Sequence, residues 1–145
     1  MAKGISKTDL AYIAGIVDGE GSIFISKQTD VRCRKGYSYK LQVAVCNTIE
    51  WLPQWLYFMF GGSIIARPNT GLSDREIWHW SIADRKALAF LELILPYLKL
   101  KKPQADLAIK FQKVKKIRNS KPDEEIAVEE AQRILMSSWN TKNKT

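Results

Sequence analysis

The sequence predicts an α+β protein whose helices and antiparallel hairpins follow the order αββαββααα. Two observations lead to this fold class. Apolar residues recur at helical spacing in several long segments, while β-branched and aromatic residues dominate shorter segments that pair across turns. No repeat, low-complexity stretch or long linker divides the 145 residues, so we expect one domain over 1–145.

The first half of the chain is expected to hold two helices around a long hairpin. Ser6 or Thr8 can cap a first helix, which Asp18 and Gly19 should end. Pro53 is tolerated only in the first turn of a later helix. The expected elements are a helix ending near 18, strands over 22–28 and 40–45, and a helix over 50–60 that Gly61 and Gly62 stop.

The second half repeats a hairpin and then becomes helical. A polar turn separates strands expected over 63–67 and 76–82. Asp84 can cap a helix that Pro96 ends, and Pro103 suits the first turn of the next helix, which should run to about 118. A last helix over about 121–138 is expected to have an apolar face formed by Ala127, Ala131 and Ile134.

The composition favours a globular protein with a polyanionic partner. Lys and Arg number 23 against 15 Asp and Glu, and 97–121 alone carries nine basic residues against one acidic residue. Clustered basic side chains release counterions from a phosphate backbone, although a solvated helix face explains the same run. No apolar run approaches the ~20 residues of a membrane helix. The start carries no secretory signal, so we expect an intracellular protein that is not secreted.

The segment Leu10-Ala-Tyr-Ile-Ala-Gly-Ile-Val-Asp-Gly-Glu-Gly-Ser-Ile23 carries the chemistry. Ala11, Gly15 and Gly19 lie four residues apart, which would let a second helix approach closely. Gly19 and Gly21 can take unusual backbone angles, so Glu20 can be displayed at the helix end as a metal ligand would be.

Three simpler explanations of this segment compete. Asp-Gly is a common turn, and a purely structural helix pair would leave Glu20 solvated. An EF-hand loop starting at Asp18 is excluded, because Ile23 replaces the glycine and Thr29 replaces the bidentate glutamate.

The segment Ala14-Gly-Ile-Val-Asp-Gly-Glu-Gly21 resembles the signature of the LAGLIDADG homing endonucleases. The resemblance covers about 8–118 and implies the family's αββαββα fold, with a saddle-shaped antiparallel sheet and extra C-terminal helices. Further similar segments are Asn47-Thr48, Phe60-Gly-Gly62 and Leu95-Pro-Tyr-Leu-Lys-Leu-Lys-Lys-Pro-Gln-Ala-Asp-Leu107.

The single copy of the motif implies a homodimer, because members with one motif pair their signature helices across a twofold axis. The interface residues expected from this are Ala11, Ala14 and Gly15. By the same resemblance, Glu20 and the carbonyl of Gly19 would bind a divalent metal. Hard oxygen ligands suit Mg²⁺, and one histidine in the whole chain argues against zinc.

The resemblance also implies two further catalytic residues. Lys101 corresponds to the family's active-site lysine, although Lys99 or Lys102 could serve. Asn47 corresponds to a polar residue that organises water. The chain departs from the family where Trp51 and Leu52 occupy the region in which some relatives carry an arginine, and where Glu20 replaces an aspartate.

The family lays its sheet into the major groove of DNA, and a strand pair fits that groove. Each candidate DNA-contacting residue could instead be a solvated surface residue. The candidates are Ser26, Gln28, Arg32, Arg34, Lys40, Gln42, Arg67, Asn69, Arg75, His79, Lys110 and Lys116.

Together these features predict a magnesium-dependent endonuclease that cuts both strands of double-stranded DNA at a long pseudo-palindromic site. The resemblance implies an intron-encoded protein of a prokaryotic cytoplasm or an organelle, with no membrane or small-molecule substrate. An RNA-splicing maturase and a catalytically silent DNA-binding regulator remain alternatives on the same scaffold.

Overall fold

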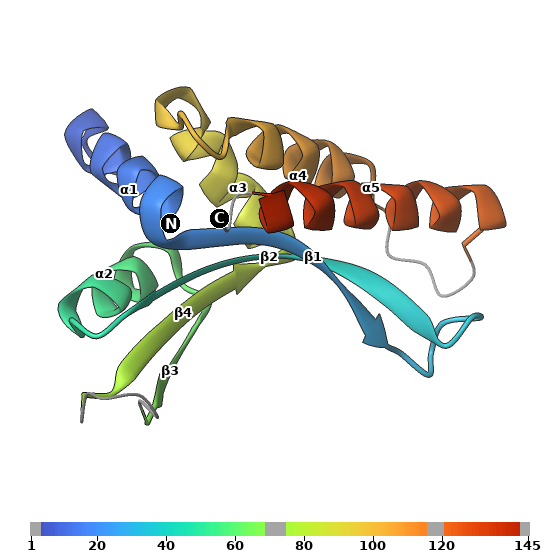
Figure 1. The fold of residues 1–145 in the computed structure, drawn as a ribbon, viewed down its shortest axis with the longest axis horizontal. Coiled ribbons are helices and arrows are strands. Elements are labelled where there is room, and N and C mark those ends of the chain that lie inside the picture. Colours follow the sequence, from blue (N-terminus) through green and yellow to red (C-terminus); the bar gives the residue numbers. More distant parts are fainter. Residues whose placement is uncertain (1–3, 69–74, 116–120, 143–145) are drawn as a thin grey trace.

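The computed structural model describes residues 4–68, 75–115 and 121–142. The elements follow the predicted order, with one added short helix (Figure 1). They are α1 (Lys7–Glu20), β1 (Gly21–Thr29), β2 (Tyr37–Asn47), α2 (Trp51–Phe60), β3 (Ser63–Arg67), β4 (Ile77–Ala83), α3 (Asp84–Ile94), the 3-10 helix η1 (Leu95–Tyr97), α4 (Lys102–Val114) and α5 (Asp123–Lys142). The predicted α+β fold class is therefore confirmed.

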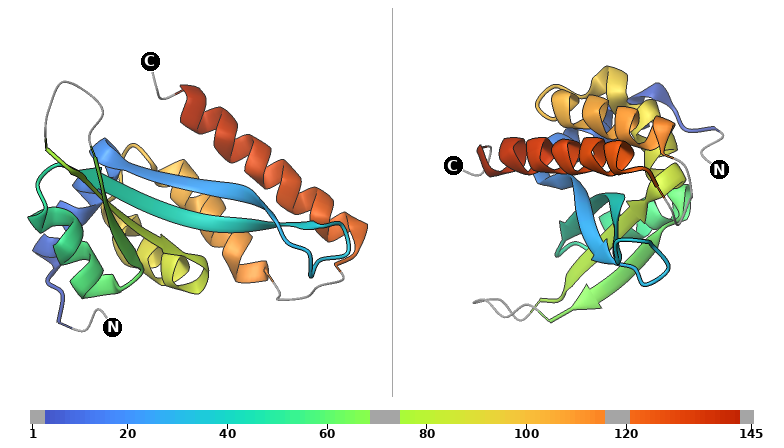
Figure 2. Two further views of the ribbon diagram at one scale, coloured as in Figure 1. Left: turned by 90° about the horizontal axis from the view of Figure 1, so that it is seen from below. Right: turned by 90° about the vertical axis from the view of Figure 1, so that its right-hand side faces the viewer.

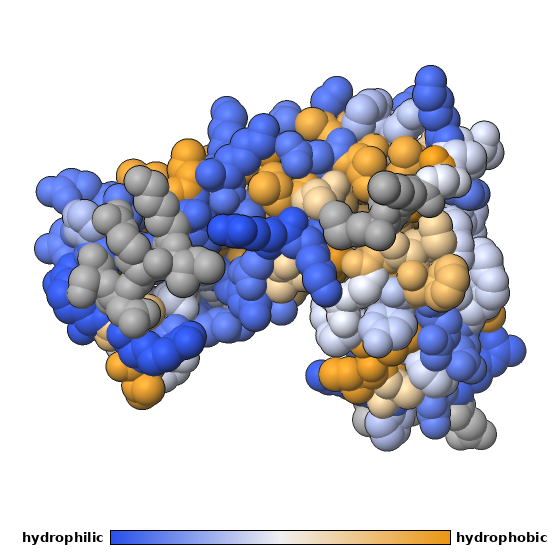
Figure 3. Space-filling model, turned by 180° about the vertical axis from the view of Figure 1, so that it is seen from behind, coloured by the Kyte–Doolittle hydropathy of each residue, from blue (hydrophilic) through white to orange (hydrophobic). Residues whose placement is uncertain are grey.

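The four strands form one antiparallel sheet in the order β1-β2-β4-β3. The sheet bends into an arch, and α1, α3, α4 and α5 lie over its convex side (Figure 1). Seen from behind, the molecule is hollowed between the two ends of this arch (Figure 3). The helices thus leave the concave side of the sheet uncovered.

The two sides of the sheet follow the alternation of residues along each strand. On β2, Leu41, Val43 and Val45 are fully buried under the helices, while the residues between them are only half-buried. We call the concave side the open face. Its residues are Ser22, Phe24, Ser26 and Gln28 of β1, Ser38, Lys40, Gln42, Ala44 and Cys46 of β2, Ser63, Ile65 and Arg67 of β3, and Ile77, His79 and Ser81 of β4.

An aromatic cluster fastens the second hairpin to the helices. The ring centroid of Phe90 lies 4.8 Å from that of Phe60 and 5.3 Å from that of Trp80, both at edge-to-face angles. The indole Nε1 of Trp80 donates a hydrogen bond to the carbonyl of Gly61 at 2.8 Å. This cluster holds α2, β4 and α3 in one packed unit.

The helix boundaries differ from the sequence expectations at several places: α4 ends at Val114 and not near 118, α5 extends to Lys142 and not to about 138, and α1 and α3 also differ. Ser6 caps α1, as expected, by accepting a 3.0 Å hydrogen bond from the Asp9 amide. The helix then continues through Asp18 and Gly19 and ends only at Glu20. Asp84 does not cap α3 but is its first residue, at a φ of 56° that is strained for an aspartate.

The face of α5 that packs on the domain also differs from the expected one. Ala127, Ala131 and Ile134 share one side of α5, as predicted, but this side is exposed to solvent and does not pack on the domain. The helix instead packs through Met136 and a set of polar side chains, and it runs alongside β1 (Figure 2). The amide of Asn140 donates a 2.9 Å hydrogen bond to the carbonyl of Ile23 in that strand.

None of the described helices is both long enough and apolar enough to cross a membrane.

Candidate active site and nucleic-acid interface

The end of α1 passes directly into β1, and Gly21 makes this sharp change possible. A Cβ atom at residue 21 would lie 2.8 Å from the Cα of Val17, which no side chain tolerates. The backbone angles of Gly21 are ordinary for a strand, so close approach is the reason for glycine here. Glu20 is thereby displayed, exposed, at the last position of the helix.

Asn47 meets Glu20 from the end of β2. Its Nδ2 donates a 2.8 Å hydrogen bond to Oε2 of Glu20. Its own Oδ1 accepts a 2.7 Å hydrogen bond from the backbone amide of Ile49, which fixes which way the amide group points. One carboxylate oxygen of Glu20 is therefore held in place by a positioned donor.

Asp18 brings the lysine-rich loop after η1 to the same helix end. Its carboxylate accepts hydrogen bonds from the backbone amides of Lys99 at 2.8 Å, Leu100 at 3.2 Å and Lys101 at 2.9 Å. Three amides converging on one carboxylate make a strong, charge-assisted anchor. Asp18 was missed from sequence as a functional residue, because its partners lie more than 80 positions away.

Lys101 is the lysine of this loop that turns toward the helix. Its Nζ donates a 2.8 Å hydrogen bond to the carbonyl of Asp18, and its side chain is half-buried, whereas Lys99 and Lys102 are exposed. The last turn of a helix leaves its carbonyls without helical partners, which makes the Asp18 carbonyl available to the ammonium. Glu20, Asn47 and Lys101, predicted from distant segments, thus meet around the end of α1.

This arrangement has the donor set for a hard divalent cation. The exposed Glu20 carboxylate and the carbonyl of Gly19, in the last turn of α1, both offer oxygen. Within the described residues, no group of three or more histidine, cysteine, aspartate or glutamate side chains is placed to hold a metal.

The hairpin of β1 and β2 brings four of the predicted DNA-contacting residues onto the open face. Ser26 faces Lys40 across the strands, and its hydroxyl donates a 3.0 Å hydrogen bond to the Gln42 side chain. Gln28 lies two residues further along the same face.

The second hairpin adds two more. Arg67 is exposed on β3, and His79 lies on β4 opposite Cys46 of β2. The Sγ of Cys46 is 2.8 Å from Nδ1 of His79, and burial raises the pKa of this thiol.

The remaining predicted DNA-contacting residues are more scattered. Arg32 and Arg34 lie in the β1–β2 turn, where they pair with Asp30 at 3.0 Å and Asp123 at 2.6 Å. Lys110 is exposed on α4, over the convex side, so the structure separates it from the open face. Arg75 lies two residues before β4, while Asn69 and Lys116 lie outside the described residues.

The hydrogen bonds from Arg32 hold the pKa of Asp30 at about 2. The turn therefore keeps this ion pair over the whole neutral range.

The small-residue face of α1 is uncovered. Ala11, Gly15 and Gly19 are exposed, and a Cβ atom built on either glycine meets no atom within 4 Å. Ala14, which we expected beside them, is fully buried in the chain's own core because it lies on the side of α1 that carries Ile13 and Val17. Ala14 is therefore not available to a second chain.

The fold is that of the LAGLIDADG homing endonucleases. The structure of I-CvuI in complex with a DNA target superposes with a TM-score of 0.76 at 20% identity, covering 92% of this chain and 82% of that chain. The I-LtrWI LAGLIDADG homing endonuclease bound to target DNA gives a TM-score of 0.59 at 18% identity, covering 92% of this chain and 44% of that one.

Two curated relatives are similar in sequence. The DNA endonuclease I-CreI of Chlamydomonas reinhardtii is 29% identical over 109 residues, which are 73% of this chain and 63% of that protein. The DNA endonuclease I-CvuI of Chlorella vulgaris is 29% identical over 117 residues, which are 77% of this chain and 66% of that protein. The chain thus spans less than two thirds of the length of either relative. No family model matches the chain.

Proposed function

We propose that this protein is a homodimeric, magnesium-dependent endonuclease that makes a double-strand break at a specific site in DNA. One observation carries the proposal: Glu20, Asn47 and Lys101 meet at the end of α1, next to an uncovered face of small residues. The relatives named as DNA endonucleases, I-CreI and I-CvuI, support the same activity.

Each residue of this site has a separate task in the proposed reaction. Asn47 orients the Glu20 carboxylate through its 2.8 Å hydrogen bond, and its fixed amide leaves it placed to order a water molecule. Lys101 brings a positive charge to the place where negative charge develops on the attacked phosphate. Asp18 keeps Lys101 there by holding the backbone of its loop.

Glu20 and the Gly19 carbonyl are the residues that would hold Mg²⁺. A bound divalent cation would supply a nucleophilic hydroxide and neutralise charge on the scissile phosphate and the leaving oxygen. The structures of I-CvuI with DNA in 2 mM Mg and in 2 mM Ca support divalent cations as partners of this fold. A second copy of Glu20 and the oxygens of the DNA phosphates would complete the ligand set.

We propose that two chains pair through Ala11, Gly15 and Gly19 of α1. Small residues at this spacing let two helices approach closely, and the uncovered face has room for a second helix. Pairing there places the two copies of Glu20 near each other. It also joins the two open faces into one longer surface for double-stranded DNA in the major groove.

We place the protein inside a cell, in a prokaryotic cytoplasm or an organelle, where an intron-encoded endonuclease meets its DNA target. The maturase and the silent DNA-binding regulator are the competing functions, and neither gains support from a specific contact in this structure.

Cleavage of a DNA library containing intron insertion sites, with and without Mg²⁺, tests the proposal. We expect Mg²⁺-dependent double-strand breaks at a few sites, and no breaks in the presence of EDTA. Glu20→Gln should lower cleavage by about a hundredfold or more while DNA affinity changes little, because it removes a charge that touches no base. The matched control Glu50→Gln changes another exposed carboxylate, that of the N-cap residue of α2, which accepts a hydrogen bond from Gln54. Full cleavage by Glu20→Gln at saturating Mg²⁺ would contradict the proposal.

A further inference from the structure

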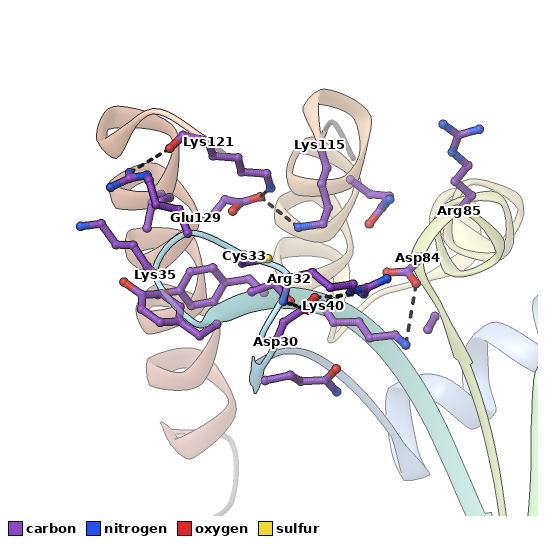
Figure 4. Close-up of a pocket in the computed structure, with 18 of the residues that line it drawn as sticks. Asp30, Arg32, Cys33, Lys35, Lys40, Asp84, Arg85, Lys115, Lys121 and Glu129 are labelled. Carbon is purple, nitrogen blue, oxygen red and sulfur yellow. Dashed lines mark hydrogen bonds and ion pairs between the residues drawn. The ribbon is translucent and has the colours of Figure 1, made fainter. Parts of the chain in front are cut away.

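A deep pocket of about 610 Å³ opens on the other end of the molecule from the candidate active site. β4 pairs with β2 only from Gln42 to Asn47, and the pocket lies beside the first half of β2, which β4 does not reach. The β1–β2 turn, the start of α3, the end of α4 and the start of α5 surround it (Figure 4). Its volume is in the range of small-molecule sites. Eight basic side chains line it against three carboxylates.

Among the described residues, the most buried basic side chains of this pocket outnumber the carboxylates that they contact. Lys115 and Lys121 both bond to the same oxygen of Glu129, at 3.1 Å and 2.9 Å. The three side chains are only 14%, 12% and 11% exposed, so water screens them weakly. One carboxylate thus faces two lysine side chains with little solvent around them, and burial lowers the pKa of Lys115, so an additional anion would stabilise its charged form. Figure 4 shows the side chains of both lysines directed to Glu129.

A second pair of cations repeats this pattern at the mouth of the pocket. Arg34 and Lys35 both contact Asp123, at 2.6 Å and 3.4 Å. Two cations again share one carboxylate, which makes the pocket and its entrance attractive to an anion with more than one charge.

The pocket also contains an unpaired hydrogen-bond acceptor. Oε1 of Gln112 has no hydrogen-bond partner among the described residues, although the side chain is only 8% exposed. A buried acceptor without a donor costs about 1–3 kcal/mol. A ligand that carries hydroxyl or amino groups would supply that donor.

We infer that this pocket is a binding site for a phosphate-bearing molecule whose phosphate lies beside the ammonium groups of Lys115 and Lys121 and whose hydroxyl or amino group reaches Gln112. Sugar phosphates and nucleotides have both features. The same phosphate chemistry could come from the backbone of a nucleic acid that reaches the pocket, and the experiment separates these sources.

Ribose 5-phosphate and pyrophosphate are the probes, and isothermal titration and thermal unfolding of the full chain are the measurements. We expect both to bind the DNA-free protein and to raise its Tm, when sodium chloride is adjusted to keep ionic strength equal. Lys115→Met should lower the affinity for both probes by about tenfold or more, which corresponds to about 1.4 kcal/mol. It should leave the Tm of the ligand-free protein equal or higher, because Lys121 and Glu129 then form a balanced pair. Lys121→Met is the second variant should the first fail to fold.

Two controls make the result specific. Lys113→Met removes one charge from the same helix, but Lys113 pairs with Glu92 outside the pocket, so probe binding should not change. Gln112→Leu should weaken ribose 5-phosphate more than pyrophosphate, because only the sugar offers several hydroxyl donors.

A duplex of random sequence identifies the source of the phosphate. Binding of both small probes, with duplex affinity unaffected by Lys115→Met, supports a free ligand. A backbone phosphate in the same pocket is supported if neither probe binds and Lys115→Met lowers the affinity for the duplex while Lys113→Met does not. If neither the probes nor the duplex distinguishes Lys115→Met from Lys113→Met, the inference is wrong. The probe titrations use no DNA cleavage, so they are independent of the proposed endonuclease activity.

Discussion

Asp18 has an anchoring task that differs from that of the carboxylate two residues later. Its carboxylate accepts hydrogen bonds from three backbone amides, so it is poorly suited to bind a cation. One carboxylate oxygen of Glu20 accepts a hydrogen bond from the neutral amide of Asn47, and the side chain remains exposed. The two acids of the motif therefore differ: Asp18 holds the lysine loop, and Glu20 stays exposed for the proposed cation.

Lys101→Met tests the role of the lysine that this anchor positions. We expect single-turnover cleavage to slow by about a hundredfold with little change in DNA affinity, because an interaction made mainly in the transition state lowers the rate and not ground-state binding. Rapid-quench kinetics on the enzyme–DNA complex measure the rate.

Lys99→Met and Lys102→Met are the controls for losing one nearby charge. Both side chains are exposed on the same loop, so they should lower affinity and reduce its salt dependence without slowing the bound complex. Equal rates for all three variants would remove Lys101 from the catalytic residues.

At the level of elements, sequence predicts what is local and misses what depends on distant partners. The helices and both hairpins followed from apolar spacing and turn residues, because those patterns act within one segment. The packing side of α5 did not, since it is set by Tyr39, Asn140 and the lysines bound to Glu129, which come from different parts of the chain. Ala127, Ala131 and Ile134 lie on the more apolar side of α5, and this side nevertheless faces solvent.

Glu130 on α5 gives this docking a pH dependence. The Arg133 guanidinium and the Tyr39 hydroxyl, which donate hydrogen bonds to it, lower its pKa from 4.5 to about 2. The ionised form thus stabilises the fold fully above pH 4.5, and the contribution is lost as pH falls through about 2.

We expect Glu130→Gln to lower the free energy of unfolding by about 0.5–1 kcal/mol at neutral pH. The difference in the free energy of unfolding between wild type and variant should disappear as the pH is lowered from 4.5 toward 2. Urea unfolding at a series of pH values measures this difference. Glu124→Gln, on the exposed side of α5, should show no such difference. A difference that stays constant down to pH 2 would refute this role of Glu130.

The small-residue face of α1 allows assembly to be separated from folding. Gly15→Leu should make the protein monomeric, because a leucine cannot occupy a close helix crossing. The monomer should still fold, since a Cβ atom there meets nothing within 4 Å and leucine favours the helix by about 1 kcal/mol over glycine, and its Tm should no longer depend on protein concentration.

Gly21→Ala is the opposite case. It should destabilise the monomer, because the added methyl group would lie 2.8 Å from the Cα of Val17. Light scattering and thermal unfolding of both variants measure the two effects. A Gly15→Leu protein that remains a dimer would exclude this face as the interface.

For the whole molecule, a twofold dimer presents the same open face twice, so its target should be a pseudo-palindrome. Gln28→Ala should relax base preference at one pair of symmetric positions, at a cost of about 1–3 kcal/mol. Lys110→Met, on the convex side, should leave base preference unchanged. Selection from randomised target libraries measures both, and an asymmetric change for Gln28→Ala would argue against a symmetric complex.

The thiol of Cys46, which contacts His79 on the open face, can be labelled chemically to report whether that face is covered. With Cys33 replaced by serine, Cys46 is the one thiol left in the chain. Because burial raises its pKa, alkylation by iodoacetamide should be slow at neutral pH and quicken in alkali. A bound duplex should shield this sulfur and slow the labelling about tenfold or more, whereas pyrophosphate, whose pocket does not include Cys46, should not. Mass spectrometry of the alkylated protein would therefore tell, without any cleavage, whether DNA lies under the arch.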